Sequence, residues 1–390
     1  MAGIYIHVPF CSQFCTYCDF YSVKEGRRSL DFLSALIVES ESKRGFFKGA
    51  ESHSQTLYFG GGTPSLIDPQ ELGKIARTVC IHHGFNPPES LDEFTVEVNP
   101  DDASLTYLKS LYSNGVRRLS MGIQSFNENH LRWMNRRHSA AAAVKAFYNA
   151  REAGFDNISI DLIFGFEGMS TEEWRFNLLK ATELYPEHIS SYQMSIEPRT
   201  KLGKEYAKGS YTPPEDSTSY NQYSLLQKTL EEAGYIQYEV SSFALRGREA
   251  LHNSRYWDRT PYLGLGPAAH SFDGERRFGN RSSLTAYIKR FSAEGKAEAS
   301  QPGYRERYIS SERLSSKDVF NETLMLSLRR VAGLNLRHIE GLVNQNEFSR
   351  FMVRVDRMLL SGDLELSGEN IKIPPGRLFL SDGIIRDLFC

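Results

Sequence analysis

Short apolar stretches alternate with helix-like stretches along the first half of the chain. The apolar stretches predict strands over 4–8, 56–59, 94–98, 118–123, 158–163 and 189–196. Apolar residues spaced three and four positions apart predict helices over 30–47, 69–82, 102–112, 127–134, 140–153 and 171–184. We expect the last of these helices to begin at Thr171, with a capping box that lacks its acid. Regular alternation of strands and helices predicts a parallel sheet.

Six such units predict an α/β fold built as a partial (β/α)6 barrel of the TIM type, and a doubly wound open sheet is the alternative. In either architecture the carboxyl ends of the strands form the functional face. Polar or glycine-rich segments follow the predicted strands at that end. They are residues 11–18, residues 60–63, Glu97, Gln124, Asp161 and Ser195. The pattern therefore predicts one site assembled from several strands.

The second half of the chain changes character. A polar loop over 211–216 precedes a predicted helix over 218–232 and a strand over 235–243, and residues 295–317 have the composition of a linker. From residue 319 the pattern predicts helices over 319–330, 336–342 and 348–361, then a hairpin over 364–366 and 371–373. That order is typical of a winged-helix domain. We expect a core barrel over 1–235, a barrel-closing extension and linker over 236–316, and a C-terminal winged-helix-like α+β domain over 317–390.

Charge and composition exclude several classes of partner. The formal net charge is −2, so no overall positive field attracts nucleic acid. Acidic and basic residues are nearly equal in number within 318–390, which disfavours DNA as a partner of the winged-helix-like part. No apolar run is as long as a membrane span, and the first predicted strand follows Met1 without room for a signal peptide. Five cysteines in such a chain favour the reducing cytoplasm.

Three of the five cysteines, Cys11, Cys15 and Cys18, lie in one loop with the spacing C-x3-C-x2-C. Three thiolates can hold three irons of a [4Fe-4S] cluster and leave the fourth iron open for chemistry. A disulfide would leave one thiol over, and a structural zinc site would need a fourth ligand at finger spacing. Both alternatives are weaker than the cluster. The remaining thiols, Cys80 and Cys390, are expected to be inert.

Two further groups of residues are candidates for ligand binding. Glycines such as Gly61 and Gly62 let the backbone approach a ligand closely, although a tight turn explains them equally well. Polar side chains at strand ends offer donors and acceptors for a ligand, although structural ion pairs are the alternative for each of them. The segment from His252 to Trp257 gathers a histidine, an asparagine and two aromatic rings. Imidazole is a common haem-iron ligand and aromatic rings stack on porphyrins, but a buried structural histidine is the ordinary alternative.

The cysteine spacing, with Tyr17 before the last cysteine, resembles the radical S-adenosylmethionine (SAM) superfamily. Five ordered motifs resemble the family that contains oxygen-independent coproporphyrinogen III oxidase and a haem chaperone related to it. These motifs begin at Tyr5, Tyr58, Glu97, Met121 and Asp161. The resemblance covers nearly the whole chain. It implies that Cys11, Cys15 and Cys18 hold a [4Fe-4S] cluster. It also implies a SAM site formed by Tyr5, Gly61, Gly62, Thr63, Glu97, Gln124, Arg136 and Asp161, with a looser match at Ser195 and His270.

Three features distinguish the two branches of that family. The oxidase has a fourth cysteine where this chain has Phe20, and it has an N-terminal extension where only four residues precede Tyr5 here. The chaperone branch carries the motif H-N-x-x-Y-W, which matches the segment that begins at His252. The resemblance thus implies a protein that binds haem, with His252 as the candidate ligand.

The chaperone branch also implies particular partners. They are acceptor haemoproteins such as those of the respiratory chain, and both peripheral membrane contact and a homodimer are compatible with that role. The alternatives are a coproporphyrinogen III oxidase, which would decarboxylate propionates through a 5'-deoxyadenosyl radical, and a radical enzyme with another substrate. Retained SAM motifs in a carrier of haem have no explanation in the sequence.

Overall fold

The computed structural model describes residues 2–24, 26, 28–47, 54–298 and 307–390. A twelve-stranded sheet dominates it, in the order β14-β13-β12-β11-β1-β4-β5-β6-β7-β8-β10-β9. The central strands are β1 (Ala2–Val8), β4 (Gln55–Gly61), β5 (Glu93–Val98), β6 (Arg118–Gln124), β7 (Ile158–Phe164) and β8 (His188–Gln193). Neighbours among these six pair in parallel, and β11 (Tyr262–Leu265) adds a seventh parallel strand beside β1. The partial barrel that the strand–helix alternation predicted is confirmed, and its sheet is open because β14 and β9 at its two edges do not pair with each other.

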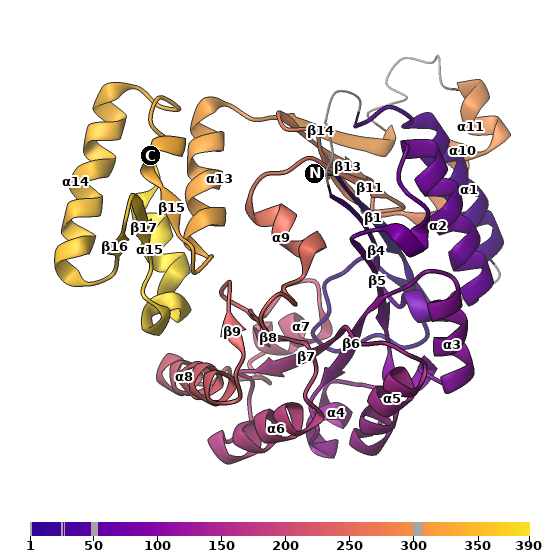
Figure 1. The fold of residues 1–390 in the computed structure, drawn as a ribbon, viewed down its shortest axis with the longest axis horizontal. Helices are drawn as coiled ribbons and strands as arrows, with labels where there is room; N and C mark the ends of the chain where they lie inside the picture. Colours follow the sequence, from indigo (N-terminus) through magenta and orange to yellow (C-terminus); the bar gives the residue numbers. More distant parts are fainter. Residues whose placement is uncertain (1, 25, 27, 48–53, 299–306) are drawn as a thin grey trace.

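Helices cover the outer face of this curved sheet (Figure 1). They are α1 (Ser29–Ser42), α2 (Pro69–His83), α3 (Leu105–Ser113), α4 (Glu128–Trp133), α5 (Ala140–Glu152) and α6 (Thr171–Leu184). Every second side chain of the strands packs against them: Leu119 and Met121 of β6, for example, are fully buried in the core. Because side chains alternate across a strand, the intervening residues face the inside of the barrel.

The inner face of the barrel is polar, and this polarity sets up the site. On β6 the inward positions are Arg118, Ser120 and Gln124, and on β5 they include Glu97. Strands buried on both faces in a parallel sheet are ordinarily apolar throughout. Inward polar residues therefore mark the interior as a place for ligands as well as for packing.

Several local expectations are wrong in ways that have simple causes. Ser170, and not Thr171, caps α6. Its capping box is complete because the Glu173 carboxylate accepts from the Ser170 N–H, so the acid lies one position earlier than we expected. The strand over 189–196 ends at Gln193. The strand over 235–243 is instead a tight antiparallel pair, β9 (Ile236–Gln237) and β10 (Ser242–Ala244).

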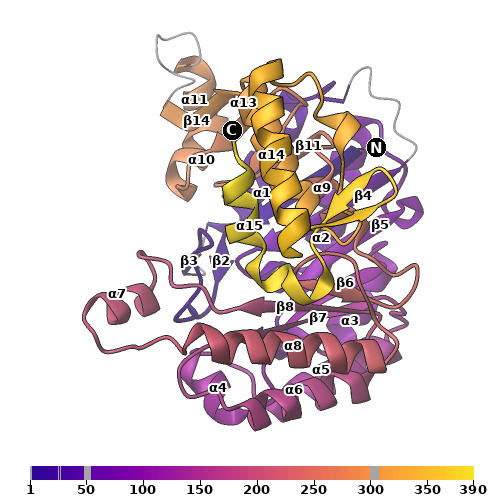
Figure 2. The ribbon, with the colours of Figure 1, turned by 90° about the vertical axis from the view of Figure 1, so that its left-hand side faces the viewer.

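Other differences concern element lengths and connections. The helices over 30–47 and 102–112 are shorter, as α1 and α3. A helix that we did not predict, α7 (Lys201–Ala207), lies in the long loop that follows β8 and projects from the barrel (Figure 2). The segment 295–317 is no simple linker, because it holds the end of α11 (Ala293–Glu298), the strand β14 (Ile309–Arg313) and the start of α13; residues 299–306 lie outside the described residues.

The antiparallel strands β12 (His270–Phe272) and β13 (Arg276–Asn280) connect β11 to β14, so the predicted extension continues the barrel sheet. The division at residues 235 and 316 stays a prediction. Among the described residues, no helix combines the length and the apolar character that crossing a bilayer requires.

The C-terminal part contains α13 (Ser316–Leu328), α14 (Gln345–Ser361) and α15 (Ser381–Leu388) around a small sheet of β15 (Leu334–Asn335), β17 (Asn370–Lys372) and β16 (Glu365–Ser367). The helix expected over 336–342 is only a short 3-10 turn at Leu336–His338. The hairpin is confirmed. Arg259 and Arg277 form ion pairs with the buried Glu322 of α13 and so tie this part to the barrel.

Candidate functional site

The three clustered cysteines follow β1 at the carboxyl end of the barrel. Cys11 ends the short strand β2 (Phe10–Cys11), which pairs with β3 (Val23–Lys24). Thr16 fixes the middle of the loop: its N–H donates to the carbonyl of Met134 at 3.2 Å, and its carbonyl accepts from the N–H of Leu202 in α7 at 2.9 Å. All three thiols are free and partly exposed. The loop therefore presents its sulfurs from a backbone that is held at both sides.

Donors from two other loops, the one after α4 and the one after β4, reach these sulfurs. Arg136 donates from Nη1 to Cys15 Sγ at 3.3 Å and from Nη2 to the Gly122 carbonyl at 2.6 Å. Thr63 Oγ1 donates to Cys11 Sγ at 3.6 Å. Such donors stabilise thiolates, the form of cysteine that ligates metals.

The thiols are set up for metal-linked deprotonation. Burial raises the pKa of the Cys18 thiol to about 11, so cluster binding must release protons from this loop. Within the described residues, no three His, Cys, Asp or Glu side chains are arranged around one metal ion. Each cysteine of a cubane cluster binds a separate iron, so the cysteine loop fits a cluster without meeting that single-ion geometry.

The glycine loop after β4 forms the adjoining wall. Gly61 has φ +109°, a conformation that favours glycine. A Cβ on Gly62 would lie 3.1 Å from Cys11 Sγ and 2.6 Å from the Phe10 carbonyl. The loop is thus packed directly against the cysteine loop, with no room for a larger residue.

Glu97 is the polar centre beneath that glycine loop. Its two carboxylate oxygens accept from the Tyr58 hydroxyl at 2.9 Å and from the Gly61 N–H at 3.0 Å. Burial raises the pKa of Glu97 to about 7, and burial also raises the pKa of Asp161, on the next strand but one, to about 6. The interior therefore holds two carboxyl groups that change charge near neutral pH.

The raised pKa of Glu97 predicts a pH dependence of stability. Because the folded state is favoured when this acid is protonated, the free energy of unfolding of the cluster-free protein should fall as pH rises from 4.5 to about 7. The loss from this group is on the order of 2–3 kcal/mol. Urea unfolding of Glu97→Gln should show that much less loss between about pH 5 and about pH 8 than the wild type does. Equal losses in the two proteins would contradict the prediction.

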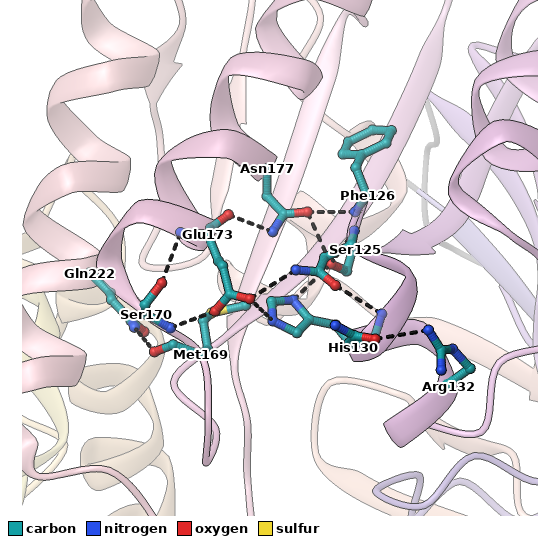
Figure 3. A network of polar contacts seen from close by, with 11 residues as sticks. Ser125, Phe126, His130, Arg132, Met169, Ser170, Glu173, Asn177 and Gln222 are labelled. Atoms are coloured by element: carbon teal, nitrogen blue, oxygen red, sulfur yellow. Dashed lines mark hydrogen bonds and ion pairs between the residues drawn. The ribbon is translucent and has the colours of Figure 1, made fainter.

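A network of polar contacts holds the loop after β6 (Figure 3). Gln124, the last residue of β6, has φ +68°. Asn177 of α6 accepts from the Phe126 N–H and from the Ser125 hydroxyl. Ser125 also contacts His130 Nδ1 at 3.1 Å, and the capping residue Glu173 accepts from Asn127. The capping box of α6 thus also supports the strand end that carries Gln124.

The structure brings most of the predicted residues to the carboxyl end or the interior of the barrel. Tyr5 points inward, and its hydroxyl contacts His7 Nδ1 at 3.2 Å. Ser195 differs from the prediction, because β8 ends two residues earlier and Ser195 is exposed on the following segment. His270 is exposed at the start of β12, near His7.

His252 lies on α9 (Leu251–Trp257), against Thr56 near the amino end of β4. It is 1% exposed. Its Nδ1 contacts Thr56 Oγ1 at 2.9 Å, its Nε2 contacts the Tyr256 hydroxyl at 3.0 Å, and its ring stacks on Tyr58. Burial lowers the pKa of His252 to about 3. In this arrangement both ring nitrogens are engaged, so His252 anchors α9 and offers no free lone pair to a haem iron.

Sequence reasoning missed a cavity beside α9, between the barrel and the C-terminal part. It has a volume of about 560 Å³. Aromatic side chains line much of it: Phe164, Tyr192, Tyr223, Tyr238, Tyr256, Trp257 and Phe379. They come from two barrel strands, α8 (Asp216–Glu232), the β9–β10 turn, α9 and the segment before α15. No linear motif joins these segments; only the H-N-x-x-Y-W motif, which supplies Asn253, Tyr256 and Trp257, indicated the place.

Comparisons with known proteins agree with this geometry. The radical SAM superfamily matches residues 5–178. The heme chaperone HemW of Bacillus subtilis is 33% identical over 86% of this chain and 85% of its own length. The heme chaperone HemW of Synechocystis is 31% identical over 94% of this chain and 87% of its own. A zebrafish protein (Danio rerio), mitochondrial radical S-adenosyl methionine domain-containing protein 1, is 31% identical over 87% of this chain and 75% of its own.

Among solved structures, coproporphyrinogen III oxidase (HemN) from Escherichia coli superposes with a TM-score of 0.81. The alignment covers all of this chain and 90% of that one, at 23% sequence identity. The likeness extends through the C-terminal part and establishes a common fold.

Proposed function

The chain belongs to the family of HemW heme chaperones, and on that premise we propose that it binds haem and delivers it to acceptor haemoproteins. Its place among radical SAM proteins implies a [4Fe-4S] cluster and SAM as well. Respiratory enzymes are the proposed acceptors. A cytoplasmic location, peripheral contact with a membrane and a homodimer are further parts of this proposal.

The aromatic cavity beside α9 is the observation that carries the proposal. Its volume lies within the range of about 300–1,000 Å³ that is typical of ligand pockets. A porphyrin is a large flat ring, and aromatic faces pack well against such rings. Figure 1 shows α9 between the sheet and α13, so a bound ring would contact the barrel, the motif helix and the C-terminal part together. We therefore propose this cavity as the haem site, in place of a site on His252.

The cysteine loop is the proposed cluster site. Cys11, Cys15 and Cys18 would hold three irons, with Arg136 and Thr63 donating to the sulfurs. When bound, the cluster supplies an open iron and a single electron. Gly62 leaves room beside the Cys11 sulfur, and the backbone hydrogen bonds of Thr16 fix the middle of the cysteine loop.

The adjoining polar wall is the proposed SAM site. Gly61, Gly62 and Thr63 offer backbone groups, while Glu97, Gln124, Arg136 and Asp161 offer charged and polar side chains, with Tyr5 beneath them. Ser195 and His270 stay proposals at the edge of this wall. An oxidase acting on coproporphyrinogen III is the second candidate function, because the chain carries the residues that we propose for both the cluster and SAM.

An anaerobic comparison separates the two functions. The protein with its cluster reconstituted should take up about one haem per chain in an absorbance titration, as one haem site in the aromatic cavity predicts. With SAM and a reductant it should form no protoporphyrinogen from coproporphyrinogen III. Protoporphyrinogen formation would establish the oxidase, and absence of haem uptake would refute the chaperone.

A further inference from the structure

Arg118 is a buried cation of the barrel interior that belongs neither to the cluster site nor to the proposed SAM wall. It is the first residue of β6, and its side chain points inward, opposite to Leu119. Only 2% of it is exposed, which makes it one of the largest fully buried side chains. It is the inward residue at the amino end of its strand, about 20 Å along β6 from Gln124 at the other end.

No hydrogen bond or ion pair of the Arg118 side chain is found in the part of the chain that the structure describes, and its buried Nε has no acceptor. A guanidinium does not lose its charge in a protein, so burial without an acceptor is costly. Burial is the largest cause of the shifted pKa of five nearby groups, and the charge of Arg118 is a further cause for each. These groups are Tyr58, Asp161, His188, Tyr238 and His252. Asp161 is the one acid among them, and it forms no ion pair within 4 Å of Arg118.

The surroundings of Arg118 connect it to the aromatic cavity. Tyr238 lines that cavity, and its hydroxyl contacts Nε2 of the buried His188 at 2.8 Å. Tyr192 also lines the cavity and is an inward residue of β8, while Tyr256 joins the cavity to His252. Arg118 is not itself among the residues that line the cavity. His188, the first residue of β8, links Tyr238 of the cavity to the amino end of the strands, where Arg118 begins β6.

We propose that Arg118 binds a carboxylate carried by the ligand of the aromatic cavity. A planar guanidinium matches a carboxylate with two parallel hydrogen bonds, and a carboxylate arm would supply the acceptors that Arg118 lacks. The inference rests on the proposed function, because haem carries two propionates of this kind. SAM carries a carboxylate too, but Gly61, Gly62, Thr63 and Gln124 of the proposed SAM wall lie at the carboxyl end of the strands. Asp161 is the member of that wall that reaches toward Arg118, because it accepts from Ser120 of β6 at 3.5 Å.

The test compares haem with haem dimethyl ester, in which both carboxylates are capped. Wild-type protein should bind haem about ten- to a hundredfold more tightly than the ester. Arg118→Gln should lose that preference because its affinity for haem falls while its affinity for the ester stays the same. Arg118→Lys should retain part of the preference. Arg117→Gln removes the same charge from the neighbouring residue, which contacts Tyr112 on the other side of the sheet, and should leave the preference unchanged.

Each outcome decides the matter. Equal binding of haem and ester by the wild type overturns the assignment but leaves the chaperone standing, and this comparison needs no variant to fold. Binding of neither porphyrin overturns the chaperone and the assignment together. Weakened SAM binding in Arg118→Gln, with the preference for haem over the ester unchanged, would show that Arg118 binds the SAM carboxylate. That result would also overturn the assignment.

Discussion

Replacing Cys15 with serine should remove the [4Fe-4S] cluster from this protein. Only three cysteines lie in the loop, so the loss of one leaves two irons without a thiolate instead of one. Arg136 would also lose the sulfur to which it donates at 3.3 Å and would remain as a buried cation. We expect iron and acid-labile sulfide after anaerobic reconstitution to fall to less than about a tenth of the wild-type content.

The matched control is Cys390→Ser, which removes a thiol far from the loop in sequence. It should retain the full iron and sulfide content. Cluster content that survives in Cys15→Ser would show that another residue supplies the third ligand. Equal loss in Cys390→Ser would show that the terminal thiol takes part in the cluster.

Gly62→Ala should abolish tight SAM binding and impair cluster assembly. The added Cβ would lie 2.6 Å from the Phe10 carbonyl, 2.9 Å from the Val8 carbonyl and 3.1 Å from Cys11 Sγ. Two of these atoms belong to backbone, so they cannot turn aside, and the loop must shift. Overpacking of this kind costs about 1–3 kcal/mol, and a shifted loop moves the backbone groups that we assign to SAM.

Equilibrium dialysis with SAM measures this effect, and we expect at least about a tenfold loss of affinity, which corresponds to about 1.4 kcal/mol. Gly376→Ala is the control, because a Cβ there meets no atom within 4 Å. Wild-type affinity in Gly62→Ala would mean that SAM does not lie against this loop.

The central barrel could be predicted because its local signals and its tertiary environment agree. Strands such as β1 and β7 need buried faces, and their apolar stretches show that directly. The cysteines and the glycine loop were predictable for a related reason: each follows a strand end, and strand ends in a parallel sheet converge. The shared edge brings Thr63 to Cys11 although 52 residues separate them along the chain.

Features that depend on contacts between distant segments could not be predicted. His252 is a residue type that commonly ligates haem iron. Its partners Thr56 and Tyr58 lie almost 200 residues earlier in the chain, so its burial could not be predicted from the sequence around it. The aromatic cavity is hidden for the same reason. Arg118 did carry a signal, since a polar residue alternates with apolar ones within a strand of a parallel sheet, but the signal does not say that the side chain lacks a partner.

Haem, we propose, binds in the cavity between the barrel and the C-terminal part. The most direct test of this site is an anaerobic haem titration of the wild type, of Trp257→Ala within the cavity, and of Tyr148→Ala, which removes an exposed ring on α5. We expect about one haem per chain, with at least about tenfold weaker binding in Trp257→Ala and unchanged binding in Tyr148→Ala. Wild-type affinity in Trp257→Ala, or no haem uptake by any of the three proteins, would contradict the proposed site.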